Sequence, residues 1–152
     1  MKKYNVAVLG ATGAVGQEMM KILEERSFPI TELRPLASAR SAGKTVTFRG
    51  QAVKVQEACD SAFEGIDIVL GAAENDIAEK LAPAIVKAGC VFVDNSSAFR
   101  MNPDVPLVIP EINPEDVKKH HGIISNPNCS TIITLVAVNA LNKISPIRTM
   151  TA

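Results

Sequence analysis

The chain has 152 residues, of which 47% are hydrophobic, and its 16 basic residues balance its 16 acidic ones. This length is enough for one domain with a sizeable core and too short for two ordinary domains. A neutral chain gives no electrostatic reason to expect nucleic acid or an anionic membrane as a partner.

No apolar run is long enough to span a bilayer, and Met1-Lys2-Lys3 leads into a strand without a signal-peptide segment. Cys59, Cys90 and Cys129 stand at unrelated spacings, which fit neither a disulfide framework nor a zinc pattern. We therefore expect a cytoplasmic protein without a metal site.

The chain begins with an apolar run at residues 4–9, which is typical of a strand buried on both faces of a parallel sheet. Gly10, Gly13 and Gly16 follow, and apolar residues then recur at helical spacing. Thr12 takes the place of the second glycine in the commoner G-x-G-x-x-G pattern. Strand, glycine turn and helix in this order favour nucleotide binding over a merely structural turn.

Residues 33–37 are typical of the second strand, although Pro35 should confine its pairing. Ser38, Arg40 and Ser41 follow, and this strand end lacks the carboxylate that binds the ribose of NAD. Arg is suited to bidentate phosphate binding, so the pattern favours the 2′-phosphate of NADP. The alternative is an ordinary polar surface loop.

The middle of the chain alternates between strand-like and helical patterns, which predicts a parallel sheet. A hairpin is expected at 46–48 and 52–55, strands at 66–70, 91–93 and 123–124, a helix at 76–88 and a short helix after Asn113. Within the helix at 76–88, Pro83 predicts a kink or a break.

Near the end, Asn126-Pro127-Asn128-Cys129-Ser130-Thr131 places one cysteine at the predicted start of a helix that ends near Asn142. Free backbone N–H groups and the helix dipole favour a thiolate there, and the thiolate is the nucleophilic form of cysteine. The alternative is a small buried hydrophobe. Residues 144–152 are expected to begin a strand, which suggests a chain that is cut near a domain boundary.

Five stretches in this order resemble bacterial aspartate-β-semialdehyde dehydrogenase. They are residues 10–16 (GATGAVG), 38–43 (SARSAG), 94–100 (DNSSAFR), 105–113 (VPLVIPEIN) and 126–131 (NPNCST). The resemblance covers the whole chain and implies a Rossmann-like doubly wound α/β fold. It implies an NADP-binding domain at 1–128, and the start of a catalytic domain at 129–152, with the nucleophile helix and a first strand, truncated before the rest of the catalytic and dimerisation domain.

The resemblance also implies an activity, the NADP-dependent interconversion of β-aspartyl phosphate with aspartate semialdehyde and phosphate. Cys129 matches the nucleophile that forms a thioester, while Arg100 and Asn128 match residues around the phosphate. The implied cofactor contacts are Gly10, Thr12, Gly13, Ala14, Val15, Gly16, Ser38, Arg40 and Ser41. The partners implied are a small-molecule substrate and further copies of the chain. The implied enzyme takes part in the biosynthesis of lysine, threonine and methionine.

Two features separate the chain from the family pattern. Gly71-Ala72-Ala73-Glu74 replaces a Ser-Ala-Gly-like turn, and Ile133 stands where relatives commonly have glutamine. The family's general-base histidine and substrate-carboxylate arginine belong to the later domain, so the chain alone is expected to be inactive. His120 and His121 instead suit the polar end of a short helix.

Two alternatives remain. One is N-acetyl-γ-glutamyl-phosphate reductase. The residues on either side of Cys129, Asn128 and Ser130, argue against this alternative. The other is a non-catalytic nucleotide-binding module.

Overall fold

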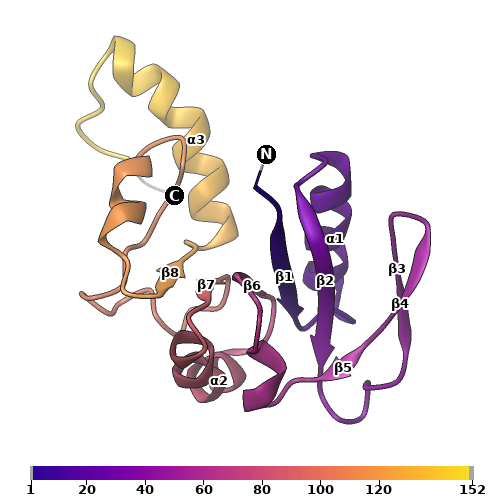
Figure 1. Ribbon diagram of the computed structural model, residues 1–152. Helices are drawn as coiled ribbons and strands as arrows, with labels where there is room; N and C mark the ends of the chain where they lie inside the picture. Colours follow the sequence, from indigo (N-terminus) through magenta and orange to yellow (C-terminus); the bar gives the residue numbers. More distant parts are fainter. Residues whose placement is uncertain (1, 151–152) are drawn as a thin grey trace.

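A six-stranded, all-parallel sheet organises the protein, and the computed structural model describes residues 2–150 (Figure 1). The strands are β1 (Tyr4–Leu9), β2 (Ile30–Ala37), β5 (Gln56–Glu57), β6 (Ile68–Gly71), β7 (Val91–Asp94) and β8 (Ile123–Ser125). The sheet order is β5-β2-β1-β6-β7-β8.

This order changes direction beside β1. The chain builds outward from β1 through β2 to β5 on one side, and then from β6 through β7 to β8 on the other. Ligands of such doubly wound sheets bind at the carboxyl ends of the strands, where the order reverses. The predicted Rossmann-like α/β class is confirmed, and the reversal between β1 and β6 is where a site is expected.

Helices α1 (Ala14–Glu25) and α2 (Asn75–Lys87) cover opposite faces of the sheet. Successive side chains of a strand point to opposite faces. Val6 and Val8 of β1 accordingly pack in one core cluster with Met20 of α1, while Ala7 and Leu9 pack in the other with α2. The continuous apolar run in β1 therefore reflects burial on both sides.

Pro35 and Pro83 lie inside regular elements, and the predictions made for them have different outcomes. Pro35 pairs with Val8 of β1, whereas β5 reaches only Leu36 and Ala37 on the other side of β2. The prediction that Pro35 confines pairing is thus confirmed. Of the kink or break predicted at Pro83, the break is wrong, because α2 continues through this residue to Lys87. Buried Leu81, Ala82 and Ile85 hold the helix on the sheet on either side of Pro83.

Smaller elements complete the chain. The predicted hairpin is present as β3 (Thr45–Phe48) and β4 (Gln51–Lys54), which pair with each other outside the main sheet. Two short 3₁₀ helices are η1 (Asp60–Phe63) and η2 (Pro114–Lys119), and η2 is the short helix predicted after Asn113.

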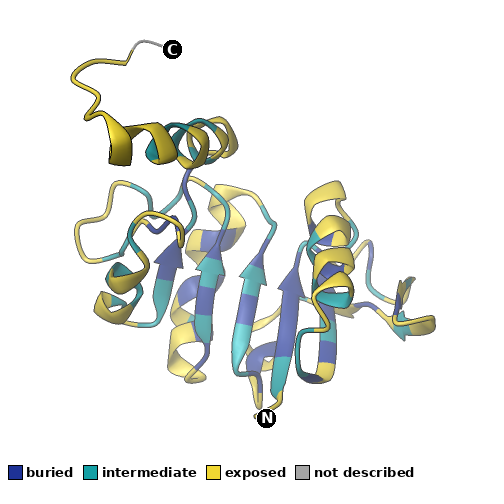
Figure 2. Ribbon diagram, turned by 90° about the horizontal axis from the view of Figure 1, so that it is seen from above, coloured by how far each residue is buried: buried dark blue, intermediate teal, exposed yellow. Residues whose placement is uncertain are grey.

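Helix α3 (Cys129–Ile144) follows β8 and contains no buried residue. Figure 2 shows it as a separate layer beyond the ends toward which the strand arrows point. Residues 145–150 form no regular element, so the strand expected at 144–152 is absent from the described part of that range. Residues 145–150 are all exposed, and none of them pairs with a strand of the described chain. Residues 151 and 152 lie outside the described residues.

Candidate cofactor cleft and nucleophile site

The glycine turn between β1 and α1 closes against the end of β6. Gly10 has a φ of +85°, and an added Cβ would lie 2.6 Å from the carbonyl oxygen of Ala72. Neither the backbone conformation nor the space therefore admits a side chain at this position. The contact joins the ends of β1 and β6, the two strands that flank the reversal point.

The other two glycines of the turn have different roles. Gly16 is buried in the first turn of α1, and a Cβ there would lie 2.3 Å from the carbonyl oxygen of Gly10. Gly13 is exposed at the N-cap with a φ of −80°, and its added Cβ would meet only that same oxygen, at 3.4 Å. Gly16 thus packs α1 against the turn, whereas Gly13 keeps the outer surface of the turn open.

The first residues of α1 present free backbone donors. Gly13 donates its N–H to the carbonyl of Gly10 at 3.0 Å, but the N–H groups of Ala14 and Val15 bond to no residue between 2 and 150. Ala14 and Val15 are also exposed. Free N–H groups at the positive end of a helix dipole form an anion site, which suits the pyrophosphate of a dinucleotide.

A cleft of about 300 Å³ lies beside this turn, between the ends of β1, β2 and β6 and the start of α2. Gly10, Thr12, Gly13 and Ser38 are the predicted site residues that line it. Its remaining lining consists mostly of apolar side chains, with two charged ones: Leu9, Ala37, Ala58, Ala72, Ala73, Glu74, Ile77, Lys80 and Leu81. Apolar walls beside free backbone donors fit a flat aromatic base attached to phosphates.

The loop after β2 divides the three residues predicted near a 2′-phosphate. Ser38 lines the cleft, and Arg40 is exposed. Ser41 is only 9% exposed, and its N–H donates to the carbonyl of Ser38 at 2.8 Å. The structure therefore places Ser38 and Arg40 where a ligand could reach them, whereas Ser41 chiefly closes the loop.

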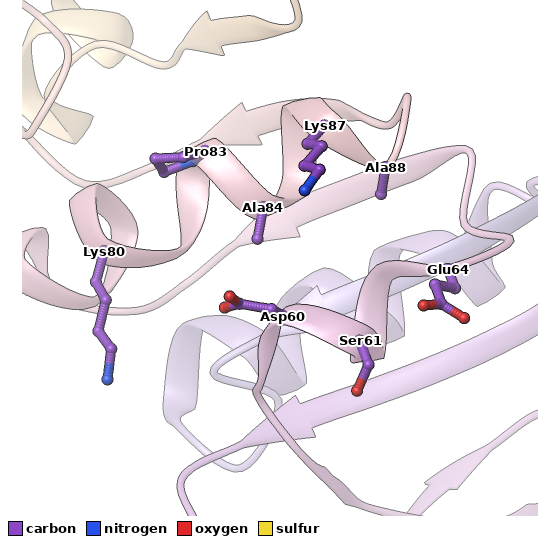
Figure 3. A pocket seen from close by; sticks show the side chains of 8 residues that line it. All are labelled: Asp60, Ser61, Glu64, Lys80, Pro83, Ala84, Lys87 and Ala88. Atoms are coloured by element: carbon purple, nitrogen blue, oxygen red, sulfur yellow. The ribbon is translucent and has the colours of Figure 1, made fainter.

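A larger hollow, of about 600 Å³, lies between η1 and α2 (Figure 3). Its lining is mostly charged and small: Asp60, Ser61, Glu64, Lys80, Pro83, Ala84, Lys87 and Ala88. None of the predicted site residues lines it. The glycine-turn cleft, not this hollow, is therefore the candidate cofactor site.

Arg100 connects the loops that follow β7 and β8. Its Nε donates to the carbonyl oxygen of Asn126 and its Nη2 to that of Asn95, each at 3.0 Å. Of the five N–H donors of a guanidinium, three therefore have no hydrogen-bond partner among the described residues. The predicted anion-binding arginine is half-buried and fixed in direction, with donors remaining for a ligand.

Cys129 is the first residue of α3, as the sequence predicts, and it is exposed. Asn128 caps the helix, because its Oδ1 accepts hydrogen bonds from the N–H of Ser130 at 3.0 Å and from its hydroxyl at 2.6 Å. The thiol of Cys129 therefore lies at a helix N-terminus, three residues after the carbonyl to which Arg100 is bonded. The alternative of a buried structural cysteine at 129 is wrong, since the thiol is exposed in this structure.

The other two cysteines differ from Cys129 and from each other. Cys90 is buried, and its thiol donates to the carbonyls of Ile66 at 3.1 Å and Phe63 at 3.4 Å. Burial raises the pKa of the Cys90 thiol, and the carboxylate of Asp67 raises that pKa further. Cys59 is exposed at the N-cap of η1, which is shorter than two turns of helix.

Sequence reasoning missed two sets of residues at this edge of the sheet. Ala72 and Ala73 contact the glycine turn and line the cleft, and the only signal was their position after a strand at the reversal point. Asn95 and Asn126 hold Arg100, and no local pattern marks this contact, because the residues lie 31 positions apart.

Residues 2–150 contain no group of three or more His, Cys, Asp or Glu side chains arranged to hold a metal ion. In the same residues, no helix has both the length and the apolar character needed to cross a membrane.

Residues 5–120 match the family described as semialdehyde dehydrogenase, NAD binding domain. The chain belongs to the semialdehyde dehydrogenase family. It is similar to the aspartate-semialdehyde dehydrogenase of Synechocystis sp., with 54% identity over 143 residues. That match covers 94% of this chain and 42% of the relative, so the chain spans about two fifths of the relative's length.

Solved structures of longer proteins match the same region. Aspartate semialdehyde dehydrogenase II of Vibrio cholerae, complexed with ASA, superposes with a TM-score of 0.87 at 46% identity, over 93% of this chain and 47% of that one. The Candida albicans enzyme with NADP gives a TM-score of 0.77 at 27% identity, over 96% and 48%. Together with the family match, these findings support a nucleotide cofactor for the semialdehyde dehydrogenase domain described here.

Proposed function

We propose that this chain carries the NADP site and the nucleophile of an aspartate-semialdehyde dehydrogenase. Residues 1–128 form the cofactor domain in this proposal, and residues 129–152 begin the catalytic domain. The observation that carries the proposal is the exposed Cys129 at the start of α3, with Arg100 bonded to the segment that leads into it. The relatives named aspartate-semialdehyde dehydrogenase support the choice of substrate.

The chain's own residues fit the cofactor. Gly10 and Gly16 leave space that a Cβ would fill, and the free N–H groups of Ala14 and Val15 suit a pyrophosphate. Ser38 and Arg40 are the reachable polar groups after β2, where they would favour a 2′-phosphate and hence NADP over NAD. When bound, the reduced cofactor NADPH would supply a hydride to the substrate carbon in the biosynthetic direction, and NADP⁺ would accept one in the reverse direction.

Cys129 acts on the carbonyl carbon of the substrate. In the biosynthetic direction, its thiolate forms a C–S bond to the acyl carbon of β-aspartyl phosphate, and phosphate leaves with the electron pair of the C–O bond. Reduction of the resulting thioester gives a thiohemiacetal, and the C–S bond then breaks to release the aldehyde and the thiolate. Arg100 and Asn128 stabilise the phosphate while it departs.

The proposed enzyme has small molecules as partners, namely β-aspartyl phosphate, aspartate semialdehyde and phosphate. It binds no nucleic acid and no membrane in this proposal. The enzyme is a cytoplasmic homo-oligomer that serves the biosynthesis of lysine, threonine and methionine. Because the chain spans about two fifths of its relatives, the general base and the site for the substrate carboxylate are assigned to no residue here.

Protection of the thiols tests the substrate part of the proposal on this chain. Aspartate semialdehyde should slow the alkylation of Cys129, because a thiohemiacetal occupies the sulfur. The matched control is Cys59, which is also exposed but lies far from α3 in the sequence. Mass-spectrometric mapping of both sites gives the two rates. Equal protection of Cys59 and Cys129 would contradict the proposal, because it would mean that the aldehyde reacts with any accessible thiol.

A further inference from the structure

Asn95 and Asn126 form a side-chain bridge between the ends of two strands. Asn95 follows β7 and Asn126 follows β8, and the Nδ2 of Asn126 donates to the Oδ1 of Asn95 at 2.6 Å. The backbone N–H of Asn126 also donates to the carbonyl of Asp94 at 2.8 Å, which continues the ladder between β7 and β8. Asn126 is therefore held by a backbone bond to Asp94 and by a side-chain bond to Asn95.

The backbone carbonyls of this same pair hold Arg100. Nε bonds to Asn126 and Nη2 to Asn95, so each asparagine supplies one carbonyl to the guanidinium. A planar guanidinium bonded at two of its nitrogen atoms has a fixed orientation, and its remaining donors then point in a fixed direction. If the two carbonyls moved apart, the guanidinium would no longer be held in that orientation.

The bridge also holds the segment that leads to the nucleophile. Asn126 is followed by the buried Pro127, by the capping residue Asn128 and then by Cys129. The position of Asn126 therefore sets both where Arg100 points and where α3 starts. No side chain among residues 2–150 bonds to the guanidinium of Arg100, so its orientation rests on these two backbone carbonyls.

We propose that Asn95 and Asn126 are positioning residues, whose side-chain bridge aims Arg100 at the anion that reacts at Cys129. The inference rests on the proposed function, because it assumes that Arg100 meets an anion beside the thiol. Asn95 then acts on the reaction only by positioning Arg100.

The test compares two reagents of nearly equal size, anionic iodoacetate and neutral iodoacetamide, in their rates of alkylating Cys129. The measured quantity is the rate with iodoacetate divided by the rate with iodoacetamide. A cation aimed at the thiol raises this ratio, whereas a general loosening of the structure changes both rates alike. Arg100→Gln should lower the ratio about 2- to 5-fold, as expected for the loss of one partly screened unit charge within about a Debye length of the thiol. Asn95→Ala should lower it by a smaller factor.

The double variant Asn95→Ala/Arg100→Gln should match Arg100→Gln alone, because Asn95 acts through the arginine. The matched control is Asn5→Ala, which loses a side-chain bond to the carbonyl of Gly65 and should leave the ratio unchanged. Asn126→Ala removes the other half of the bridge and serves as the second test if Asn95→Ala does not fold.

An effect of Arg100→Gln without an effect of either asparagine variant would overturn the positioning role and leave the proposed function intact. No effect of Arg100→Gln would overturn both the anion role of Arg100 and the inference built on it. A further loss in the double variant would also overturn the inference, since Asn95 would then act independently of Arg100.

Discussion

Arg40 is exposed in the loop after β2, and Ser38 beside it lines the cofactor cleft. We expect Arg40→Ala to weaken NADPH binding about tenfold or more and to leave NADH binding unchanged, because only NADPH carries the 2′-phosphate. Fluorescence titration of both cofactors measures the two affinities. Arg26→Ala is the matched control, since Arg26 is exposed at the far end of α1. Equal affinity of the unmodified chain for the two cofactors would contradict the preference for NADP.

The three cysteines should differ in reactivity. We expect alkylation by iodoacetamide near neutral pH in the order Cys129, then Cys59, then Cys90. The first two thiols are exposed, and only Cys129 begins a long helix. The pKa of Cys90 is raised by burial, so its thiol stays protonated as the pH rises past the ordinary thiol range. Its labelling should therefore be slowest at pH 8 and increase only at higher pH.

Mapping of the labelled peptides at several times and at two pH values measures this order. Faster labelling of Cys59 than of Cys129 would count against the assignment of Cys129 as the nucleophile. Rapid labelling of Cys90 in the folded chain would show that its burial does not persist in solution.

At the scale of elements, the glycine turn depends on the closeness of α1 to the end of β1. Gly16→Ala places a methyl group 2.3 Å from the carbonyl oxygen of Gly10, so backbone must move. We expect a loss of about 1–3 kcal/mol in the free energy of unfolding, which is the usual cost of overpacking. Urea unfolding followed by circular dichroism measures it.

Gly13→Ala is the matched control for Gly16→Ala. Gly13 has an ordinary negative φ, and its nearest neighbour would lie 3.4 Å from the added carbon. We expect its unfolding free energy to change by less than about 1 kcal/mol. Equal losses in the two variants would mean that the contact with Gly10 does not limit the approach of α1.

At the scale of the whole molecule, α3 presents an apolar surface that nothing in the described chain buries. Ile133 is 72% exposed, Leu141 62% and Ile144 86%. Apolar surface of this kind favours association, so we expect the chain to self-associate as its concentration rises. Leu141→Glu should shift sedimentation toward the monomer without lowering the melting temperature of the sheet.

Met101→Lys provides the matched control for Leu141→Glu. Met101 is 92% exposed in the loop that follows β7 and is not part of α3, so its replacement should leave the degree of association unchanged. A monomer at all concentrations, or equal effects of the two substitutions, would contradict the assignment of α3 as the associating surface.

Much of the architecture follows from local sequence patterns. The run at 4–9 and the three glycines after it predict strand, turn and helix, because burial on both faces and a tight turn each require particular residues. Asn126 to Thr131 likewise predict a helix that begins at Cys129, since Pro127 tends to end the preceding element. The capping bond from Asn128 appears only in the structure. Pro83 misled the prediction because packing on both sides of it holds α2 to the sheet.

The sequence by itself determined the family, most of the elements and the start of a helix at Cys129, because these depend on residues that lie close together along the chain. Only the tertiary structure decided that Ser41 is turned inward, that Ala72 closes the glycine turn and that Asn95 and Asn126 hold Arg100. Two of these contacts, between Arg100 and Asn126 and between Gly10 and Ala72, join residues 26 and 62 positions apart at a single sheet edge. Strand order brings such residues together, and strand order is set by the packing of the whole core.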